Sequence, residues 1–203
     1  MARTPTQSDS ILLTQAMQLF WRQGYTATGI RDLESALSLK APAIYHRFGP
    51  KDVLFRSVLD HYLSVIVGRR ISRYLEDPDP LHGLRRFFET TYDYVDATHP
   101  PLACLMVNTA AEIGENDPAV ADILRLGRER LRTAFIANLQ RLRDSGGLRS
   151  DACLDDLADT LHLCLQGMLV TSKTEPDKNR LHRQVDLILA LLPFVPSQSG
   201  VTP

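Results

Sequence analysis

Glycine and proline residues divide this chain into segments, and between them apolar residues recur at the spacing of an α-helix. One such run, which stops at Gly24, consists of Leu12, Ala16, Leu19 and Phe20. No segment shows the alternation of apolar and polar residues that marks a β-strand, and we find no internal repeat. The pattern therefore predicts an all-α fold.

About nine helices are expected, and the first three are short. The predicted ranges are about 12–23, 28–37, 51–74, 81–97, 102–113, 119–144, 154–171 and 178–192, with one further short helix between 38 and 51 that ends at Gly49-Pro50. Thr28 is a candidate cap for the second helix. We expect an N-terminal three-helix domain at 1–52, a larger helical bundle at 53–192, and a disordered tail at 193–203, which is rich in Pro, Ser and Gly.

Composition is that of an ordinary globular protein: 44% of the 203 residues are hydrophobic and 23% are charged. No apolar run approaches the roughly 18 residues of a membrane span, and residues 1–10 do not resemble a signal peptide. The cysteines, Cys104, Cys153 and Cys164, are odd in number and lack CxxC spacing. These features predict a cytoplasmic protein without a membrane partner.

Charge is distributed unevenly along the chain. Residues 1–75 hold ten Lys and Arg against five Asp and Glu, a net of +5, whereas the remainder holds thirteen against nineteen, a net of −6. A basic N-terminal part favours a polyanionic partner, although five charges are also compatible with a solvated surface.

The segment "SLKAPAIYHRFGPK", residues 38–51, predicts a short helix with two different faces. At 100° per residue, Ile44 and Phe48 fall on one side and are expected to pack against Leu33 and Leu37 of the preceding helix. The opposite side consists of Pro42, Ala43, Tyr45 and His46. Two short helices joined by a tight turn indicate a helix-turn-helix, whose projecting face fits a DNA major groove.

Several side chains near this face have chemistry suited to DNA. The Tyr45 hydroxyl can donate to a phosphate, and Arg31 can bind a guanine edge. Lys51 begins the next helix, where its charge opposes the helix dipole, and a nearby phosphate would resolve that conflict. The candidate DNA-binding residues are Thr28, Arg31, Lys40, Pro42, Ala43, Tyr45, His46 and Lys51. Each of them alone is also compatible with an ordinary surface position.

The stretch "QLFWRQGYTATGIRDLESALSLKAPAIYHRFGPKDVLF" resembles the N-terminal domain of the TetR family of bacterial transcriptional regulators. The matching positions are Leu19, Phe20, Gly24, Tyr25, Thr28, Leu33, Tyr45, Phe48, Lys51 and Leu54. Ser38 stands where that family usually has a turn glycine, so a positive φ there would be strained. Lys40 stands where a small polar residue is usual.

The resemblance implies a homodimer, with the last two helices forming a four-helix interface. This agrees with their composition, because both are apolar on more than one stripe, whereas a surface helix needs only one. The alternative is that both helices lie deep in the core. The predicted interface residues are Leu161, Leu165, Met168, Val185, Ile188 and Leu192.

The resemblance also implies a pocket for a small-molecule effector between about residues 56 and 169. Candidate ligand-binding residues are Phe87, Phe88, Tyr92, Cys104, Met106, Asn108, Phe135, His162 and Gln166. Ordinary core positions are the alternative for each. "ACLMVNTAAE" resembles the GCLxxN segment of a subgroup that responds to electrophiles, oxidants or copper. Cys104 is expected near a helix N-terminus, where a thiol is more reactive, unless it is an inert buried cysteine.

No cofactor or metal site is predicted, because HxxxH, CxxC and HExxH motifs do not occur in the chain. GxSxG, GxGxxG and Walker motifs are also missing, which disfavours an enzyme. The sequence therefore predicts a homodimeric, ligand-responsive regulator that binds a palindromic double-stranded DNA operator, with repression as the mode that the resemblance implies. A helical enzyme and a ligand-binding dimer without a DNA role remain the alternatives.

Overall fold

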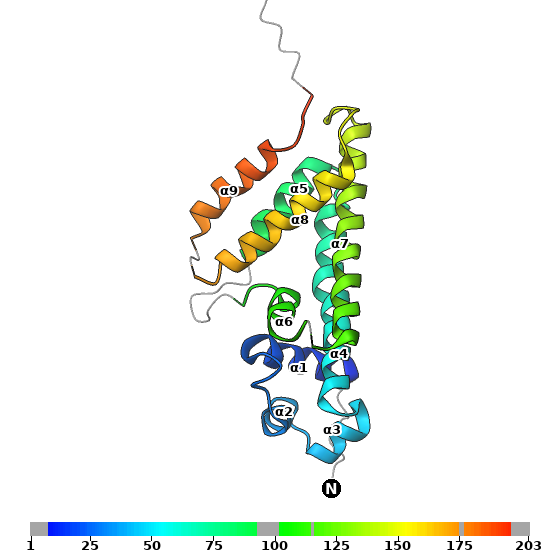
Figure 1. Cartoon of the computed structure of the whole chain (residues 1–203), viewed down its shortest axis with the longest axis vertical. Coiled ribbons are helices and arrows are strands. Elements are labelled where there is room, and N and C mark those ends of the chain that lie inside the picture. Colours follow the sequence, from blue (N-terminus) through cyan, green and yellow to red (C-terminus); the bar gives the residue numbers. More distant parts are fainter. Residues whose placement is uncertain (1–7, 93–101, 115, 175–176, 196–203) are drawn as a thin grey trace, which may run out of the picture. The chain divides into compact units, whose positions relative to one another are not determined.

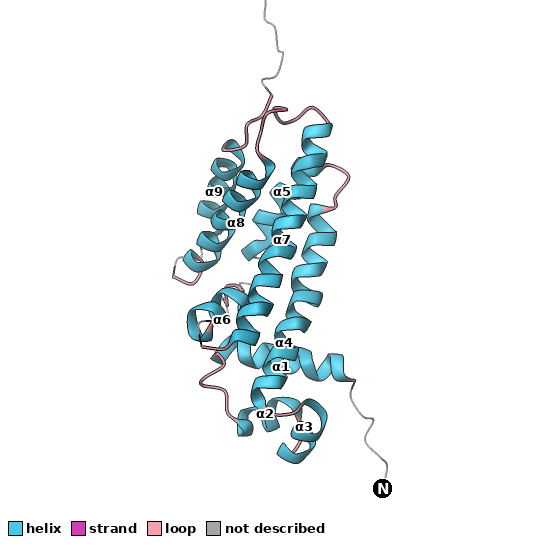
Figure 2. Cartoon of the chain, turned by 45° about the vertical axis from the view of Figure 1, so that its right-hand side comes forward, coloured by secondary structure: helices cyan, strands magenta, loops and turns pink. Residues whose placement is uncertain are grey.

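The structure is a computed structural model that describes residues 8–92, 102–114, 116–174 and 177–195. These residues form helices joined by short loops (Figures 1 and 2), so the predicted all-α fold is confirmed. In chain order the α-helices are α1 (Asp9–Gln23), α2 (Ile30–Leu37), α3 (Ala41–Phe48), α4 (Lys51–Tyr62), α5 (Pro80–Glu89), α6 (Leu105–Ile113), α7 (Pro118–Asp144), α8 (Leu154–Thr171) and α9 (Lys178–Ala190).

The predicted helix ends coincide with glycines in the N-terminal part. Gly24 ends α1 with a φ of 84°, and Gly49 ends α3 with a φ of 79°. Side chains with a Cβ rarely adopt such angles, so both positions favour glycine. At the other end of α1, the hydroxyl of Ser8 accepts a hydrogen bond from the Ile11 amide.

Thr28 does not cap α2, which corrects the sequence prediction. Gly29 holds the N-cap position, and its amide donates to the Asp32 carboxylate at 2.8 Å. The Thr28 side chain is buried, and its hydroxyl donates to the Gly24 carbonyl at 2.6 Å. Thr28 therefore closes the turn between α1 and α2 rather than starting the second helix.

The helical run that begins with α4 continues to Leu75, close to the predicted end. Its later part widens into π-helix at Leu63–Gly68 and Ile71–Leu75. Beyond it, α5 is followed by a 3-10 turn at Thr90–Tyr92, and the predicted continuation to residue 97 lies outside the described residues.

Two further boundaries differ from the prediction for local reasons. Helix α6 begins at Leu105 rather than 102 because Ala103 has a φ of 53°, which an α-helix cannot contain. Residues 193–195 are not a loose tail, since Leu148 and Phe194 form an antiparallel bridge. The Val195 amide also donates to the Gly147 carbonyl at 3.0 Å. The rest of the predicted tail, 196–203, lies outside the described residues.

The chain forms two compact units, whose boundary differs from the predicted one at residue 52. The first comprises Met1–Arg69 and Thr98–Arg128, and the second comprises Arg70–Ala97 and Glu129–Pro203. Helix α6 and the first part of α7 thus belong with the three short helices. Sequence reasoning missed this, because nothing local ties residues 102–128 to the N-terminus.

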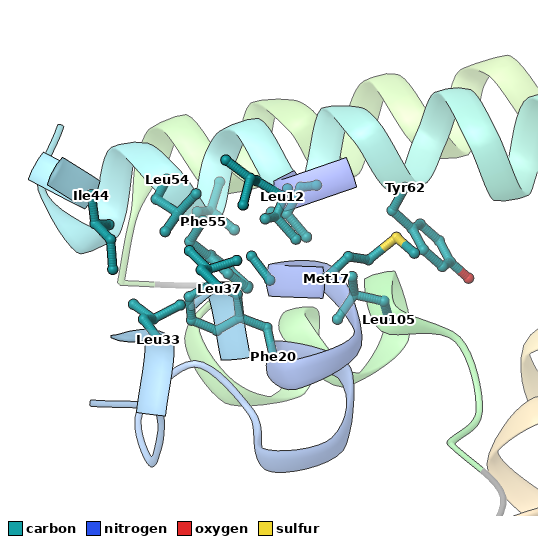
Figure 3. Packing of buried hydrophobic residues seen from close by; sticks show 14 residues of the cluster. Leu12, Met17, Phe20, Leu33, Leu37, Ile44, Leu54, Phe55, Tyr62 and Leu105 are labelled. Carbon is teal, nitrogen blue, oxygen red and sulfur yellow. The ribbon is translucent and has the colours of Figure 1, made fainter. Parts of the chain in front are cut away.

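The core of the first unit gathers apolar residues from α1 to α4 and from α6 (Figure 3). Phe20 and Phe55 meet edge to face with their ring centroids 4.8 Å apart. Leu33, Leu37 and Ile44 extend the same cluster under the short helices. Burial of each such side chain contributes on the order of 2 kcal/mol, so this cluster fixes the orientation of α2 and α3.

The second unit packs α5 against the π-helix at 71–75 and against α9. Asn138 is buried there, and its amide donates to the carbonyls of Leu75 and Pro80 at 3.2 and 3.1 Å. Gly83 permits the close approach of α5, because a Cβ at this position would lie 2.1 Å from the Tyr74 carbonyl oxygen.

We expect Gly83→Ala to lower the free energy of unfolding by about 3 kcal/mol, since a methyl group cannot fit without backbone movement. Urea denaturation followed by circular dichroism measures the change. The neighbouring variant His82→Ala is the control, because that side chain is exposed and should shift stability by about 0.5 kcal/mol or less. Equal stability of the two variants would contradict the close approach.

Candidate nucleic-acid interface

A left-handed residue joins α2 to α3. Ser38 has φ 53° and ψ 36°, which is the left-handed conformation. Glycine adopts this conformation without strain, and Ser38 stands at the position where a turn glycine is usual. The Leu39 amide donates to the Glu34 carbonyl at 3.2 Å, and the Ala41 amide donates to the Glu34 carboxylate at 2.8 Å. Glu34 therefore closes α2 with its backbone and begins α3 with its side chain, a role that sequence reasoning missed.

Helix α3 has a buried face and a projecting face, as predicted. Ile44 is 1% exposed and belongs to one cluster with Leu33 and Leu37. On the other side, Tyr45 is 48% exposed. The exposed side chains of this surface are those of Lys40, Pro42, Ala43, Tyr45 and His46. They offer few donors relative to their number, since proline and alanine have none in their side chains.

Arg47 lies on neither face. Its guanidinium binds the Asp9 carboxylate at the start of α1 and lies 5.8 Å from the centroid of the Phe48 ring. This ion pair joins the end of the projecting helix to the first turn of α1. Because the Asp9 side chain is 64% exposed, the pair contributes little to the free energy of folding.

Lys51 is half-buried at the start of α4. Its ammonium lies 4.4 Å from the centroid of the Tyr25 ring. Its charge also acts on the carboxylate of Glu112, a residue of α6. The Tyr25 ring and the Glu112 carboxylate offset the repulsion between the Lys51 charge and the positive end of the α4 dipole. A phosphate is therefore not needed to explain a lysine at this position, which corrects the sequence prediction.

The other two DNA-binding candidates differ in accessibility. Arg31 is exposed in the first turn of α2, so its guanidinium is available to a partner. Thr28 is 1% exposed and its hydroxyl donates within the turn. A phosphate contact from its side chain would require that hydrogen bond to break.

The predicted interface residues lie on the inward stripes of α8 and α9, and this is a correction. Leu161, Leu165, Met168, Val185 and Leu192 are buried within the chain, and Ile188 is half-buried. The two helices lie side by side in both views (Figures 1 and 2). Their exposed apolar side chains are Leu163, Val170, Leu187 and Leu191. The predicted surplus of apolar surface is confirmed, but at other residues.

Six candidate ligand-binding residues belong to the second unit. Phe87, Phe88 and Phe135 form one aromatic group, with Phe87 and Phe135 edge to face at 5.5 Å between centroids. His162 is buried on α8 and its Nε2 lies 2.8 Å from the Gln166 amide nitrogen. The side chain of Tyr92 lies outside the described residues.

The remaining three candidates belong to the first unit, at or near the start of α6. Cys104 is the N-cap of α6, in keeping with its predicted place near a helix N-terminus, and its sulfur accepts a hydrogen bond from the Tyr62 hydroxyl at 3.4 Å. The Asn108 amide donates to the Leu102 carbonyl at 2.8 Å. Met106 is half-buried beside Gly127, where a Cβ would lie 3.0 Å from its methyl carbon.

Other kinds of site find little support in the described part of the chain. Within those ranges, no group of three or more His, Cys, Asp or Glu side chains is placed to hold a metal ion. None of the described helices combines the length and apolar character needed to cross a bilayer.

Two short helices at a tight left-handed turn, with the second helix buried on one side and projecting on the other, define a helix-turn-helix. The class of protein that carries such a motif on an all-α body is the DNA-binding regulator.

Comparison with known proteins identifies the family. Residues 12–58 match the model described as "Bacterial regulatory proteins, tetR family", and residues 80–188 match "Tetracyclin repressor-like, C-terminal domain". The chain therefore belongs to the TetR family of transcriptional regulators and is not an enzyme.

Three similar proteins illustrate the relationship. The HTH-type transcriptional repressor ComR of Escherichia coli (strain K12) is 27% identical over 183 residues, which are 89% of this chain and 87% of that protein. A cysteine mutant of the regulator CifR, solved with 26-bp double-strand operator DNA, has a TM-score of 0.80 at 27% identity and covers 93% of this chain and 99% of its own. The reduced form of E. coli NemR, at 16% identity and a TM-score of 0.82, covers 93% of this chain and 100% of its own and shares the fold.

We expect Ser38→Gly to raise the free energy of unfolding by about 0.5–1 kcal/mol, because glycine adopts the left-handed conformation without strain. The matched control is Ser35→Gly within α2, where the same exchange should lower it by about 0.5 kcal/mol. Chemical denaturation of both variants gives the two values. A loss of stability in Ser38→Gly would show that the serine is not strained in this turn.

Proposed function

We propose that this protein is a homodimeric, ligand-responsive repressor that binds a palindromic operator through the major groove, in the cytoplasm. The observation that carries the proposal is the division of α3, whose Ile44 is buried while its opposite side is exposed. The major groove is wide enough to admit one α-helix, and a helix that packs on the protein with one face can present its opposite face to the bases.

The side chains around α3 divide into two kinds of contact. Tyr45, Lys40 and Lys51 are suited to phosphates, which set the register of a protein on DNA without reading its sequence. Arg31 and His46 are suited to base edges. Pro42 and Ala43 add only apolar contact, for example with thymine methyl groups. With so few donors, we propose that much of the specificity comes from DNA shape and from the spacing of the half-sites.

A salt titration tests the DNA role. Fluorescence anisotropy on a labelled random-sequence duplex of about 30 bp, at several salt concentrations, should give a steep negative slope of log affinity against log salt, because each neutralised phosphate contributes about −0.9 to that slope. Lys51→Met should reduce the magnitude of the slope by about one. A flat slope for the wild-type chain would favour a ligand-binding dimer without a DNA role.

The same assay with a duplex selected from a random library by the wild-type chain tests base reading. Arg31→Ala and His46→Ala should each weaken binding by about tenfold on this duplex and less on random sequence, since a good base contact contributes about 1–3 kcal/mol of discrimination. Two variants that remain as selective as wild type would exclude direct reading by these residues.

A homodimer is supported by the exposed apolar side chains of α8 and α9. Leu163 and Val170 lie seven residues apart on one side of α8. Leu187 lies on α9, and Leu191, four residues later, is the C-cap of that helix. Gly167 lies between the first two, and a Cβ there would meet nothing within 4 Å. We propose that a second copy covers this surface, because four large apolar side chains on two adjacent helices are costly to leave in water.

Leu187→Glu should therefore convert the protein to a monomer, because the interface would have to bury a carboxylate. Analytical ultracentrifugation measures the mass. Leu126→Glu is the matched control, since Leu126 is a similarly exposed leucine on α7, at 59% against 69%. That variant should remain a dimer, and dissociation of Leu126→Glu with an intact Leu187→Glu dimer would contradict the proposed surface.

An effector would act by binding the DNA-competent state and the released state with different free energies. The buried aromatic group of Phe87, Phe88 and Phe135, together with His162 and Gln166, supports an apolar ligand site with a few polar groups in the second unit. We propose a small molecule as the effector, or an oxidant that acts at Cys104.

A further inference from the structure

The carboxylate of Glu112 reaches from the last turn of α6 to the turn that follows α1. Its two oxygens accept hydrogen bonds from consecutive backbone amides, that of Tyr25 at 2.9 Å and that of Thr26 at 2.7 Å. Charge-assisted hydrogen bonds of this kind are about twice as strong as neutral ones. This contact joins a helix outside the helix-turn-helix to the turn that leads into it.

The residue before the Tyr25–Thr26 turn, Gly24, leaves room for the Glu112 carboxylate. A Cβ at Gly24 would lie 2.9 Å from one Glu112 oxygen, and Gly24 also has a positive φ of 84°. Only glycine satisfies both conditions, since it lacks the Cβ and tolerates the angle. Burial raises the pKa of Glu112, but the hydrogen bonds from Thr26 and Tyr25 and the charge of Lys51 outweigh it, so the pKa lies below its ordinary value and the carboxylate is ionised near neutral pH.

The turn held by Glu112 lies next to groups that the proposed function uses. Lys51 packs its ammonium on the ring of Tyr25, whose amide binds the carboxylate. Helix α2 begins at Ile30, four residues after Thr26, and exposes Arg31 in its first turn. A shift of the turn would therefore move a candidate phosphate contact and a candidate base contact together.

A second contact holds the other end of the same helix. The Trp21 indole donates to the carbonyls of Leu102 and Ala103 at 3.2 and 3.0 Å, just before α6 begins. Helix α6 is thus attached to the end of α1 at Trp21 and to the following turn through Glu112. The Trp21 hydrogen bonds fix the start of α6 against α1, and this keeps Glu112, near the end of α6, within reach of the turn.

We infer that Glu112 is a positioning residue for DNA binding, which acts through the Tyr25–Thr26 turn and Lys51 rather than by touching DNA. This inference rests on the proposed DNA-binding function and names a residue that the helix-turn-helix itself does not contain. A carboxylate usually weakens DNA binding by repelling phosphates. Glu112 has the opposite effect, because it holds the phosphate and base contacts in place before DNA arrives.

Charge repulsion and positioning predict opposite changes in DNA affinity when the Glu112 charge is removed, and a second carboxylate in the same unit provides a matched control. Glu112→Gln and Asp122→Asn each remove one negative charge from the first unit. Asp122 lies on α7, where it forms an exposed ion pair with Arg125. On the duplex selected by the wild-type chain, Glu112→Gln should bind about tenfold more weakly, whereas Asp122→Asn should bind equally or more tightly. On random sequence the loss in Glu112→Gln should be smaller. Equal or tighter binding of the selected duplex by Glu112→Gln would overturn the inference.

Glu112→Asp distinguishes the effect of the negative charge from that of the two hydrogen bonds. It keeps the carboxylate but shortens the side chain by one methylene, so both amides cannot be reached in the present geometry. We expect binding of the selected duplex to fall as it does in Glu112→Gln. Wild-type affinity in this variant would mean that charge alone matters and would overturn the positioning role. Thermal unfolding of every variant, measured alongside, shows that the weaker binding comes from a protein that is still folded at the assay temperature.

Amide proton shifts give a reading that does not depend on DNA. In the wild-type protein the Tyr25 and Thr26 amide resonances should titrate with the Glu112 carboxylate, and in Glu112→Gln that component should be lost. Asp52 and Asp117 act on the Tyr25 phenol, and the variant leaves both carboxylates in place. Unchanged titration of both amides in Glu112→Gln would overturn the contact itself.

The outcomes for the two proposals are distinguishable. If the wild-type chain binds the selected duplex and Glu112→Gln matches Asp122→Asn, the inference is wrong and the proposed function stands. If the wild-type chain binds no duplex in a salt-dependent way, the proposed function fails and the inference fails with it.

Discussion

Burial of Ile44 is the interaction on which the candidate interface depends. Its side chain joins Leu33 and Leu37 in the core of the first unit, and this fixes which side of α3 can project. The turn at Ser38 and the Glu34 carboxylate then set the angle between the two short helices. A rotation of α3 by one residue, or about 100°, would turn part of the projecting face towards the core, so this one contact decides which side chains are available to DNA.

Much of the N-terminal part could be predicted from the sequence, because its determinants are local. Gly24 and Gly49 end helices where the pattern places them, and the spacing of Ile44 with Phe48 gives the buried side of α3. The π-helical segments after α4 and the start of α6 could not be predicted in the same way. They depend on packing and on the left-handed Ala103, for which the sequence has no glycine or asparagine as a marker.

The site shows the same division between local and tertiary causes. Exposure of Tyr45 and His46 follows from helical periodicity, whereas the surroundings of Lys51 come from Tyr25 and from a helix about sixty residues further on. For α8 and α9 the sequence shows a surplus of apolar residues, but helical periodicity alone does not distinguish the inward stripe from the outward one. Leu161 and Leu163 look alike in a pattern, and only the packing of neighbouring helices decides that the first is buried and the second exposed.

The small projecting face of α3 has a consequence for hydration. Pro42 and Ala43 cannot replace the water molecules that bind the edges of bases in the groove, because their side chains carry no donor or acceptor. In a complex with DNA, those base edges would keep much of their water, and bridging molecules would link them to Tyr45 and His46. Recognition by this helix would then depend on how water is arranged in the groove, and its strength would change with water activity as well as with salt.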